Sequence, residues 1–291
     1  MRISVLVATC DRAENLRQLL QTVGRWTISS DLDWELWVID NNSKDSTREV
    51  AEYFAKQQPR RIRYLFEGAR GKSRALNAGL ERAGGDILVM TDDDCIPDPH
   101  WLSAIAEEFS RQPEIGLIGG RVELYDPADK AVTIRTSCER RGLSDPADFF
   151  SFIAGCNMAF RTQVYQAIGG FDIRLGPGCR CDAAEDVDFI YRAYKKGFRI
   201  EYIPEVLVYH NHGRRTDAEI QKLNRNYVIG RGAFYCKHIL KGDMEVLRMA
   251  YWEVRSLSLS LLKDLFAGRT IREQMRLLWF LFTGVTRNLA A

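Results

Sequence analysis

The stretch ILVMTDDDCIPD (residues 87–98) joins an apolar run to three consecutive aspartates. The run at residues 87–90 is short and continuous, which is typical of a strand buried in a sheet. Three carboxylates crowded at a strand end repel one another, so their placement needs an explanation. Asp92 and Asp94 are two residues apart, and at a strand end their oxygens can turn toward one point. Hard oxygen ligands suit Mg²⁺ or Mn²⁺, and such an ion would neutralise the repulsion.

The alternative for these aspartates is a turn or the N-cap of the following helix. Asp98 is better placed than Asp92 or Asp94 to cap a helix that begins near Trp101. The metal site is therefore the favoured interpretation of Asp92 and Asp94. Asp93 points to the other side on a strand-like period and is predicted to serve the local turn.

Strand-like and helix-like segments alternate before this stretch. The predicted strands cover residues 3–9, 35–40, 62–66 and 86–90, and the predicted helices cover residues 14–23, 45–56 and 74–83. This alternation predicts an α/β fold with a parallel sheet and helices on both faces. Ligands of such sheets bind at the carboxyl ends of the strands. Polar residues follow three of these strands, at 10–11, 40–41 and 91–94, and each set could also be an ordinary turn.

The second half of the chain is less regular. Helices are predicted at residues 101–110, 163–168 and 186–196, and strands at 116–124, 153–160, 200–203 and 206–209. Residues 126–150 are predicted to form a long loop. From residue 217 onward the pattern is helical.

The bulk composition limits the function classes. The 291 residues carry a net charge of +2, which does not suggest a nucleic-acid partner. The seven cysteines are an odd number without a C-x-x-C pair, which favours a reduced cytoplasmic environment. The N-terminal apolar run is short and soon charged, unlike a signal peptide, and no stretch reaches transmembrane length.

Three further groups carry polar chemistry. His210 and His212 follow a short strand, and either could add an imidazole ligand to a metal. Glu185 and Asp186 precede a helix, where acids are favourable electrostatically but can also serve as general bases. GKSR (residues 71–74) opens a helix whose N–H groups suit a diphosphate, although both common phosphate-loop patterns are absent. Singly, each group also has a purely structural interpretation.

In order, these stretches resemble the inverting GT-A glycosyltransferases of the large bacterial family 2. The matching stretches are VATCDR (7–12), VIDNNSKDST (38–47), GKSRALNAGL (71–80), VMTDDDCIPD (89–98), GCNMAF (155–160), GGFD (169–172), EDVDFIYRAYKKGF (185–198) and VYHNH (208–212). The motif DDD or ED alone would be weak evidence for this family, whereas the order and spacing of the whole series of stretches are specific to it. The resemblance implies a GT-A (Rossmann-like) fold, with a mixed, mainly parallel sheet flanked by helices.

The resemblance also implies roles on the donor side. Asp11 and Asp40 would contact the uridine-like base and the ribose of a nucleotide-sugar donor. Thr9, Lys72 and Asp93 lie in the same matched stretches and are assigned to donor binding.

Asp92 and Asp94 match the DxD motif of the family. The resemblance implies that Asp92 faces the ribose or sugar and that both belong to a site for Mn²⁺ or Mg²⁺, with Asp94 on the metal. His210 matches a further contact to the metal or the diphosphate, and His212 is the alternative.

Asp186 matches the catalytic base, and Glu185 would help to orient the acceptor. The residues implied on the donor-sugar and acceptor side are Asn157, Gly170, Phe171 and Asp172.

The predicted function is metal-dependent, inverting transfer of a sugar from a nucleoside-diphosphate sugar, UDP-linked, to an acceptor hydroxyl in glycan, polysaccharide or glycolipid biosynthesis. Three classes of acceptor remain open: a glycan, a lipid-linked acceptor or a small molecule. Cys95 departs from the family at a frequent acid, and Leu76 at a frequent Arg. Because the Q-x-x-R-W motif of processive synthases is absent, a single-addition transferase is predicted.

Two other functions remain as alternatives. A sugar-nucleotide nucleotidyltransferase usually needs a glycine-rich basic loop after the first strand, where this chain has ATCDR (residues 8–12). A catalytically inactive nucleotide-sugar-binding module would not need the pair Glu185 and Asp186.

The predicted domains are a GT-A catalytic domain over residues 1–215, with a nucleotide-sugar-binding half (1–98) and an acceptor half (99–215), and a helical extension over residues 216–291. Two interpretations of the extension remain open. Its helices pack on the core or on a second subunit as a homo-oligomer, or they lie on the inner face of the cell membrane through Trp279, Phe280 and Phe282.

Overall fold

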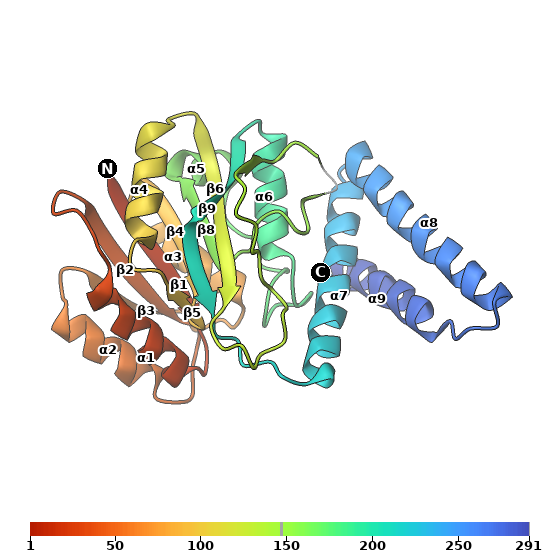
Figure 1. The fold of residues 1–291 in the computed structure, drawn as a ribbon, viewed down its shortest axis with the longest axis horizontal. Coiled ribbons are helices and arrows are strands. Elements are labelled where there is room, and N and C mark those ends of the chain that lie inside the picture. Colours follow the sequence, from red (N-terminus) through yellow and green to blue (C-terminus); the bar gives the residue numbers. More distant parts are fainter. Residues whose placement is uncertain (146–147, 291) are drawn as a thin grey trace.

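The computed structural model describes residues 1–145 and 148–290, and Figure 1 shows their arrangement around a central sheet. The nine described strands run in the order β3-β2-β1-β4-β8-β6-β9-β5, and β7 pairs with β9. The bounds are β1 (Arg2–Thr9), β2 (Asp33–Asp40), β3 (Ile62–Phe66), β4 (Ile87–Asp92), β5 (Cys95–Pro97), β6 (Ile115–Leu124), β7 (Arg141–Gly142), β8 (Asn157–Arg161) and β9 (Arg199–His210). The longest ladders, β1·β2 and β6·β9, are both parallel.

The first half of the sheet is parallel, as the sequence predicts. β1 pairs with β2 on one side and with β4 on the other. In these registers Thr9 lies opposite Asp40 and Ala8 lies opposite Asp92. The carboxyl ends of three strands therefore meet at one edge of the sheet, where ligands of parallel sheets bind.

Antiparallel pairs join the second half to the first. β8 lies antiparallel between β4 and β6. The predicted strands at 200–203 and 206–209 form the single strand β9, which shifts its register against β6 between Ile203 and Leu207. Pro204 lies inside this shift, where its missing N–H breaks no regular ladder. The short strand β5, which the sequence does not predict, pairs Cys95 with His210.

Two predicted segments change. The predicted strand at 153–160 begins only at Asn157, because residues 154–157 turn and the N–H of Gly155 donates to the Asp186 carboxylate at 3.0 Å. The predicted loop at 126–150 contains β7, and its residues 146–147 lie outside the described part of the chain.

Helices cover both faces of the sheet. α1 (Ala13–Thr22), α2 (Thr47–Gln57) and α4 (Trp101–Arg111) share one apolar cluster with the sheet, and a 3₁₀ turn, η1 (Val23–Arg25), follows α1. α3 (Lys72–Arg82), α5 (Thr162–Ile168) and α6 (Glu185–Lys195) share the cluster on the other face. The stripe Leu16, Leu19 and Leu20 of α1 is fully buried, as expected for an amphipathic helix against a sheet.

Three long helices follow the sheet: α7 (Asp217–Ile239), α8 (Met244–Phe266) and α9 (Arg272–Leu289). A capping box between Thr216 and Glu219 begins α7. Phe234 and Tyr235 of α7 are buried in the same cluster as α6, whereas α8 and α9 project away from the sheet (Figure 1). Among the described residues, no helix combines the length and the apolar character needed to cross a bilayer.

Candidate active site

A cavity of about 690 Å³ opens at the carboxyl ends of β1 and β4. Its floor includes Thr9 and the aspartates at 92–94, and its far wall is the start of α6 and one side of α7. The predicted residues that line it are Thr9, Lys72, Asp92, Asp93, Asp94, Glu185, Asp186 and His210. Residues more than two hundred positions apart in the sequence thus face one space.

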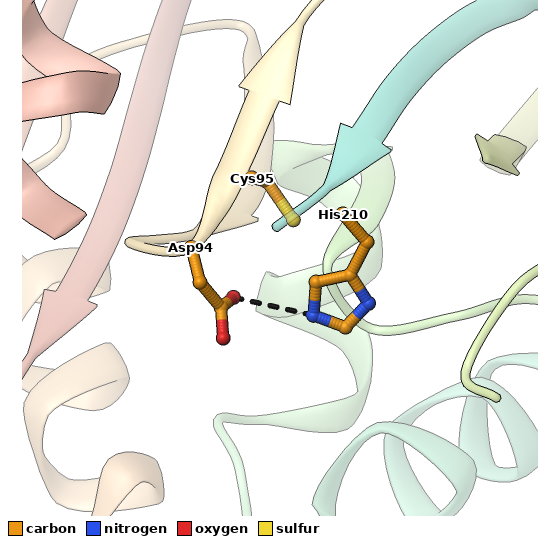
Figure 2. Close-up of side chains that lie close together, drawn as sticks. All are labelled: Asp94, Cys95 and His210. Atoms are coloured by element: carbon orange, nitrogen blue, oxygen red, sulfur yellow. Dashed lines mark ion pairs between the residues drawn. The ribbon is translucent and has the colours of Figure 1, made fainter. Parts of the chain in front are cut away.

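Asp94 and His210 are brought together by the pairing of β5 with β9 (Figure 2). The Asp94 Oδ1 atom lies 3.3 Å from His210 Nε2. Arg12, which the sequence analysis did not single out, donates from Nη1 to Asp93 at 3.0 Å and to Asp94 at 2.7 Å. One guanidinium therefore sits between two of the three aspartates and offsets their repulsion.

These contacts shift the pKa values of the buried groups. Burial raises the pKa of Asp93 to about 6, although Arg12 opposes the shift. Burial would also raise the pKa of Asp94, but the contact with His210 and the charge of Arg12 hold it well below its usual range. Burial alone would lower the pKa of His210, but the close contact with the charged Asp94 carboxylate raises it to about 9.

The donor atoms around Asp94 fit a divalent cation. Ligand atoms of Asp94, Cys95 and His210 lie within 4.8 Å of one another, and Asp94 Oδ1 is buried without a well-aligned hydrogen bond from any described group. The Nδ1 atom of His210 lies 3.0 Å from the hydroxyl of Thr133, which orients the ring and leaves Nε2 toward Asp94. A carboxylate with an imidazole suits Mn²⁺.

Cys95 is a poor ligand in this group. A hydrogen bond with Cys156, together with burial, raises the pKa of the Cys95 thiol well above its ordinary value. Only the thiolate form of cysteine ligates metals well. A raised pKa keeps Cys95 in the thiol form, so its buried side chain fills space in the core instead of binding a metal. The departure from the family pattern at Cys95 thus places a small buried side chain next to the acids.

Lys72 lies between two carboxylates at the start of α3. Its Nζ atom is 2.6 Å from Asp92 Oδ1 and 3.6 Å from Glu185 Oε1. Burial alone would lower the pKa of Lys72, but the two acids hold it well above its ordinary value. Burial and the neighbouring charge of Asp186 raise the pKa of Glu185 to about 7, against the influence of Lys72.

Asp186 is held at the first turn of α6. Its Oδ1 accepts the N–H of Val187 at 2.8 Å, and its Oδ2 accepts the N–H of Gly155 at 3.0 Å. A Cβ at position 155 would lie 2.7 Å from Oδ2, so only glycine allows this approach. Ala184, just before the helix, has φ of 75°, a left-handed conformation that costs about 1–2 kcal/mol for a residue with a Cβ.

Asp11 and Asp40 lie at the rim of the cavity without lining it. Asp40 is buried and accepts the hydroxyl of Tyr64 at 2.9 Å. Asp11 is exposed and pairs with Arg70 at 2.8 Å. Arg70 itself lines the cavity, so this pair joins the rim to the interior.

His212 points away from the cavity. Its side chain is fully buried, its Nδ1 accepts the N–H of Arg214 at 3.0 Å, and Asp129 lies 3.6 Å away. Between the two histidines, the geometry therefore favours His210 as the residue next to Asp94.

Four residues expected on the donor-sugar and acceptor side do not line the cavity: Asn157, Gly170, Phe171 and Asp172. The Asn157 amide is consumed by Trp101 Nε1 and by two main-chain carbonyls at 2.8 and 2.9 Å. Phe171 stacks on Phe189 at 4.6 Å, and Asp172 pairs with Lys237 at 2.8 Å. These contacts engage the side chains of Asn157, Phe171 and Asp172 within the protein interior.

The sequence analysis missed the wall contributed by the helical extension. The cavity-lining residues of this wall on α7 are Leu223, Asn226, Tyr227 and Arg231, and Arg214 precedes the helix. No local pattern marks them, because they follow the last matched stretch and face the cavity only through the packing of α7. The missed Arg12 does lie in a matched stretch, directly after Asp11.

Comparison with known proteins gives the family. Residues 4–169, more than half of the chain, match Glycosyl transferase family 2, and residues 87–290 match Glycosyl transferase family group 2. Glycosyltransferase AglE of Haloferax volcanii is 26% identical over 231 residues, which cover 79% of this chain and 72% of AglE. The glucosyl-dolichyl phosphate glucuronosyltransferase of the same organism is 24% identical over 220 residues, which cover 72% of this chain and 69% of that protein.

Solved structures share the fold. The mannosyltransferase PcManGT from Pyrobaculum calidifontis, in complex with GDP-Man and Mn²⁺, has a TM-score of 0.68 at 19% identity and covers 99% of this chain and 86% of its own. S. aureus TarS 1-349, in complex with UDP-GlcNAc, has a TM-score of 0.65 at 17% identity, with 98% and 82% covered. The resemblance and the GT-A-like fold expected from the sequence are thereby confirmed. The chain belongs to glycosyl transferase family 2 and is a glycosyltransferase.

Proposed function

We propose that this chain transfers a sugar, with inversion, from a nucleoside-diphosphate sugar to an acceptor hydroxyl. The observation that carries the proposal is that Asp186 faces the same cavity as Lys72 and the aspartates at 92–94. A basic carboxylate and a diphosphate-binding edge in one cavity allow a single displacement at the anomeric carbon.

The nucleotide lies along the edge formed by β1 and β2 in this proposal. Asp40 and Asp11 flank the place for base and ribose, beside Thr9. Lys72 stands at the N-terminus of α3, where helix N–H groups favour phosphate. We propose UDP as the nucleotide, as in the donor UDP-GlcNAc bound to S. aureus TarS. GDP is tested beside it, because PcManGT was solved with GDP-Man.

Asp186 is the general base of the proposed reaction. It removes the proton of the acceptor hydroxyl as that oxygen forms its bond to the anomeric carbon, and the bond between this carbon and the diphosphate oxygen breaks. The N–H groups of Gly155 and Val187 fix the carboxylate for this task. A positioned general base typically contributes about 10²–10⁴-fold to the rate.

The leaving nucleoside diphosphate gains negative charge during the transfer. Lys72 is close enough to the aspartate edge to offset part of that charge. Asp94 and His210, with Asp92 nearby, would hold Mn²⁺ or Mg²⁺, which as a Lewis acid stabilises a departing diphosphate. The α7 wall, with Tyr227 and Arg231, lies on the side left for the acceptor.

A product assay tests the proposal against its alternatives. The full chain is incubated with Mn²⁺ and a panel of UDP- and GDP-sugars, and the products are identified by chromatography. Released nucleoside diphosphate supports sugar transfer or its hydrolytic side reaction, and NMR of the new anomer shows inversion. Released pyrophosphate would indicate nucleotidyl transfer, and binding without turnover would indicate an inactive module; either result contradicts the proposal.

A further inference from the structure

The two last helices, α8 and α9, expose an unusual amount of apolar surface. We call them the C-terminal hairpin (residues 244–289). Within the described ranges, twenty large apolar side chains are exposed, and fourteen of them lie between Leu240 and Leu289. Exposed apolar surface concentrated in one region commonly marks a binding surface.

One face of α9 is an apolar stripe. Met275, Trp279, Phe282 and Leu289 are spaced along one side of the helix and are 54–63% exposed. The opposite face packs on α7 through Leu281 and Gly284, which are buried. The stripe therefore points away from the protein, with the rings of Trp279 and Phe282 6.2 Å apart.

α8 also exposes apolar side chains, up to its last residue at the tip of the hairpin. Phe266, its last residue, is 88% exposed. Tyr251 and Trp252 are each more than half exposed, and their rings contact each other at 5.4 Å. Only Val246 of this helix is fully buried in the described structure. Most of the large apolar side chains of α8 are thus left exposed by the rest of the described chain.

The charges of the hairpin are sorted between inside and outside. Glu253 is turned inward and pairs with Arg231 at 2.8 Å, and Asp264 accepts from Gln274 at 2.7 Å. Glu273 is its one exposed acid among the described residues. The exposed basic side chains without an ion pair in the described part of the chain are Arg248, Arg255, Lys263, Arg272 and Arg276. The outer surface is therefore apolar and positive together.

We propose that the C-terminal hairpin lies flat in the surface of an anionic lipid bilayer. Aromatic and aliphatic side chains would enter the boundary between headgroups and acyl chains, while the arginines and lysine contact lipid phosphates. This orientation needs no membrane-crossing helix. An anionic bilayer suits both the apolar and the basic side chains of the hairpin, because its acyl chains accept the apolar groups and its phosphates attract the positive charges.

A second copy of this chain is the competing occupant. A two-fold interface places the same positively charged patch on both sides, so the basic side chains of one copy would approach those of the other. Like charges at such a contact oppose association, and buried interface centres are usually depleted of charge. Charge complementarity therefore favours the lipid surface.

Vesicle sedimentation of the full chain tests the proposal. Vesicles of phosphatidylcholine alone are compared with vesicles that also contain phosphatidylglycerol. We expect binding to the second kind that weakens as salt increases. Trp279→Ser with Phe282→Ser should reduce binding at least tenfold on both. Arg272→Gln with Arg276→Gln should reduce it roughly 10- to 30-fold on anionic vesicles only, from about 1 kcal/mol per charge.

The matched control is Tyr53→Ser with Tyr125→Ser, which removes two aromatic rings of similar exposure (55% and 54%) from other parts of the surface. This variant should sediment like the unaltered chain. Circular dichroism melts of all variants show that each is folded. Trp252 and Trp279 are the two most exposed tryptophans by the described surface, so a blue shift of emission on vesicles that is lost in Trp279→Ser locates the contact.

Three outcomes would overturn the proposal. The first is absence of vesicle binding by the folded full chain. The second is equal binding by the control and by the Trp279 and Phe282 variant. The third is a dimer in sedimentation velocity that dissociates in this variant, which would assign the surface to a second copy. Sugar transfer is not a readout of these experiments, so their failure leaves the proposed function untouched.

Discussion

Two clusters of buried charge meet on the first turns of α6, and they are balanced in opposite ways. The cavity cluster has four carboxylates against two permanent cations and a histidine: Asp92, Asp93, Asp94 and Glu185 with Arg12, Lys72 and His210. The interhelix cluster has two carboxylates against three permanent cations and a histidine: Asp172 and Asp188 with Arg174, Arg192, Lys237 and His238.

The interhelix cluster is complete in itself. Asp188 is fully buried and lies 2.7 Å from Lys237, 2.8 Å from Arg192 and 2.9 Å from His238. Burial would raise the pKa of Asp188, but these partners hold it well below its usual range. The cavity cluster, by contrast, keeps a deficit of positive charge next to open space. A cluster in which every carboxylate has its cation ties elements together, whereas a cluster with more carboxylates than cations is prepared for an incoming cation or substrate.

The largest expected effect is on catalysis, from Asp186→Asn at the cavity end of α6. The amide keeps the shape but cannot take the acceptor proton, so the transfer rate should fall about 10²–10⁴-fold. Donor affinity, measured by calorimetry with a UDP-sugar and Mn²⁺, should change little. Turnover close to that of the unaltered chain would show that another group is the base.

The second effect is on stability, from Lys237→Met in the interhelix cluster. This change removes the buried cation that pairs with both Asp172 and Asp188, and breaking such a buried pair costs about 3–5 kcal/mol. Urea unfolding measures the loss. The control is Lys195→Met, whose partners are partly exposed and whose loss should cost less than about 1 kcal/mol. Equal effects of the two variants would contradict the distinction between a buried tie and a surface pair.

The third effect has the opposite sign, from Glu185→Gln in the cavity cluster. The folded pKa of Glu185, about 7, lies above its ordinary value of 4.5. Its ionisation therefore costs stability as the pH rises from 4.5 through 7, and the glutamine removes that cost. At pH 8, with metal chelated, we expect a gain of about 3 kcal/mol in the free energy of unfolding, and no gain near pH 4. A loss of stability at pH 8 would show that Glu185 is a structural partner of Lys72.

The smallest effect concerns Arg12, which already pairs with Asp93 and Asp94. A cation bound at Asp94 has to compete with this guanidinium. Arg12→Gln should therefore tighten Mn²⁺ binding about fivefold, or by about 1 kcal/mol, because the partly exposed guanidinium acts as the internal counter-ion of the two buried carboxylates. Titration followed by Mn²⁺ paramagnetic resonance measures this. Weaker binding would instead assign Arg12 to orienting the carboxylates.

The parallel half of the fold was predictable because its signals are local. Apolar runs such as residues 3–9 and 87–90 end at polar residues, and the register of β1 with its neighbours brings those ends together. The same reasoning could not find β5, because three residues carry no periodicity and the strand exists only through its pairing with β9. Without β5, the approach of Asp94 to His210 follows from the family resemblance but not from spacing.

The predicted site residues that do not line the cavity have a common physical cause. Asn157 and Asp172 lie in matched stretches, but a sequence cannot show which way a polar side chain turns. Partners distant in sequence set the orientation of these side chains. Trp101 donates a hydrogen bond to the Asn157 amide oxygen, and Lys237 of α7 forms an ion pair with the Asp172 carboxylate. The α7 wall escaped notice for the same reason, because it reaches the cavity by long-range packing.

The close crossing of α7 and α9 has a mechanical consequence. Added Cβ atoms at Gly232 and Gly284 would collide with the carbonyl oxygens of Leu281 and Ile229, so the two backbones touch without side chains between them. Such a joint has no compressible layer, and a tilt of α9 must carry α7 with it. Tyr227 lies on α7 and faces the cavity, so α7 connects the contact with α9 to the cavity wall. We therefore expect a displacement of α9 to move the part of the cavity wall that Tyr227 forms near Asp186.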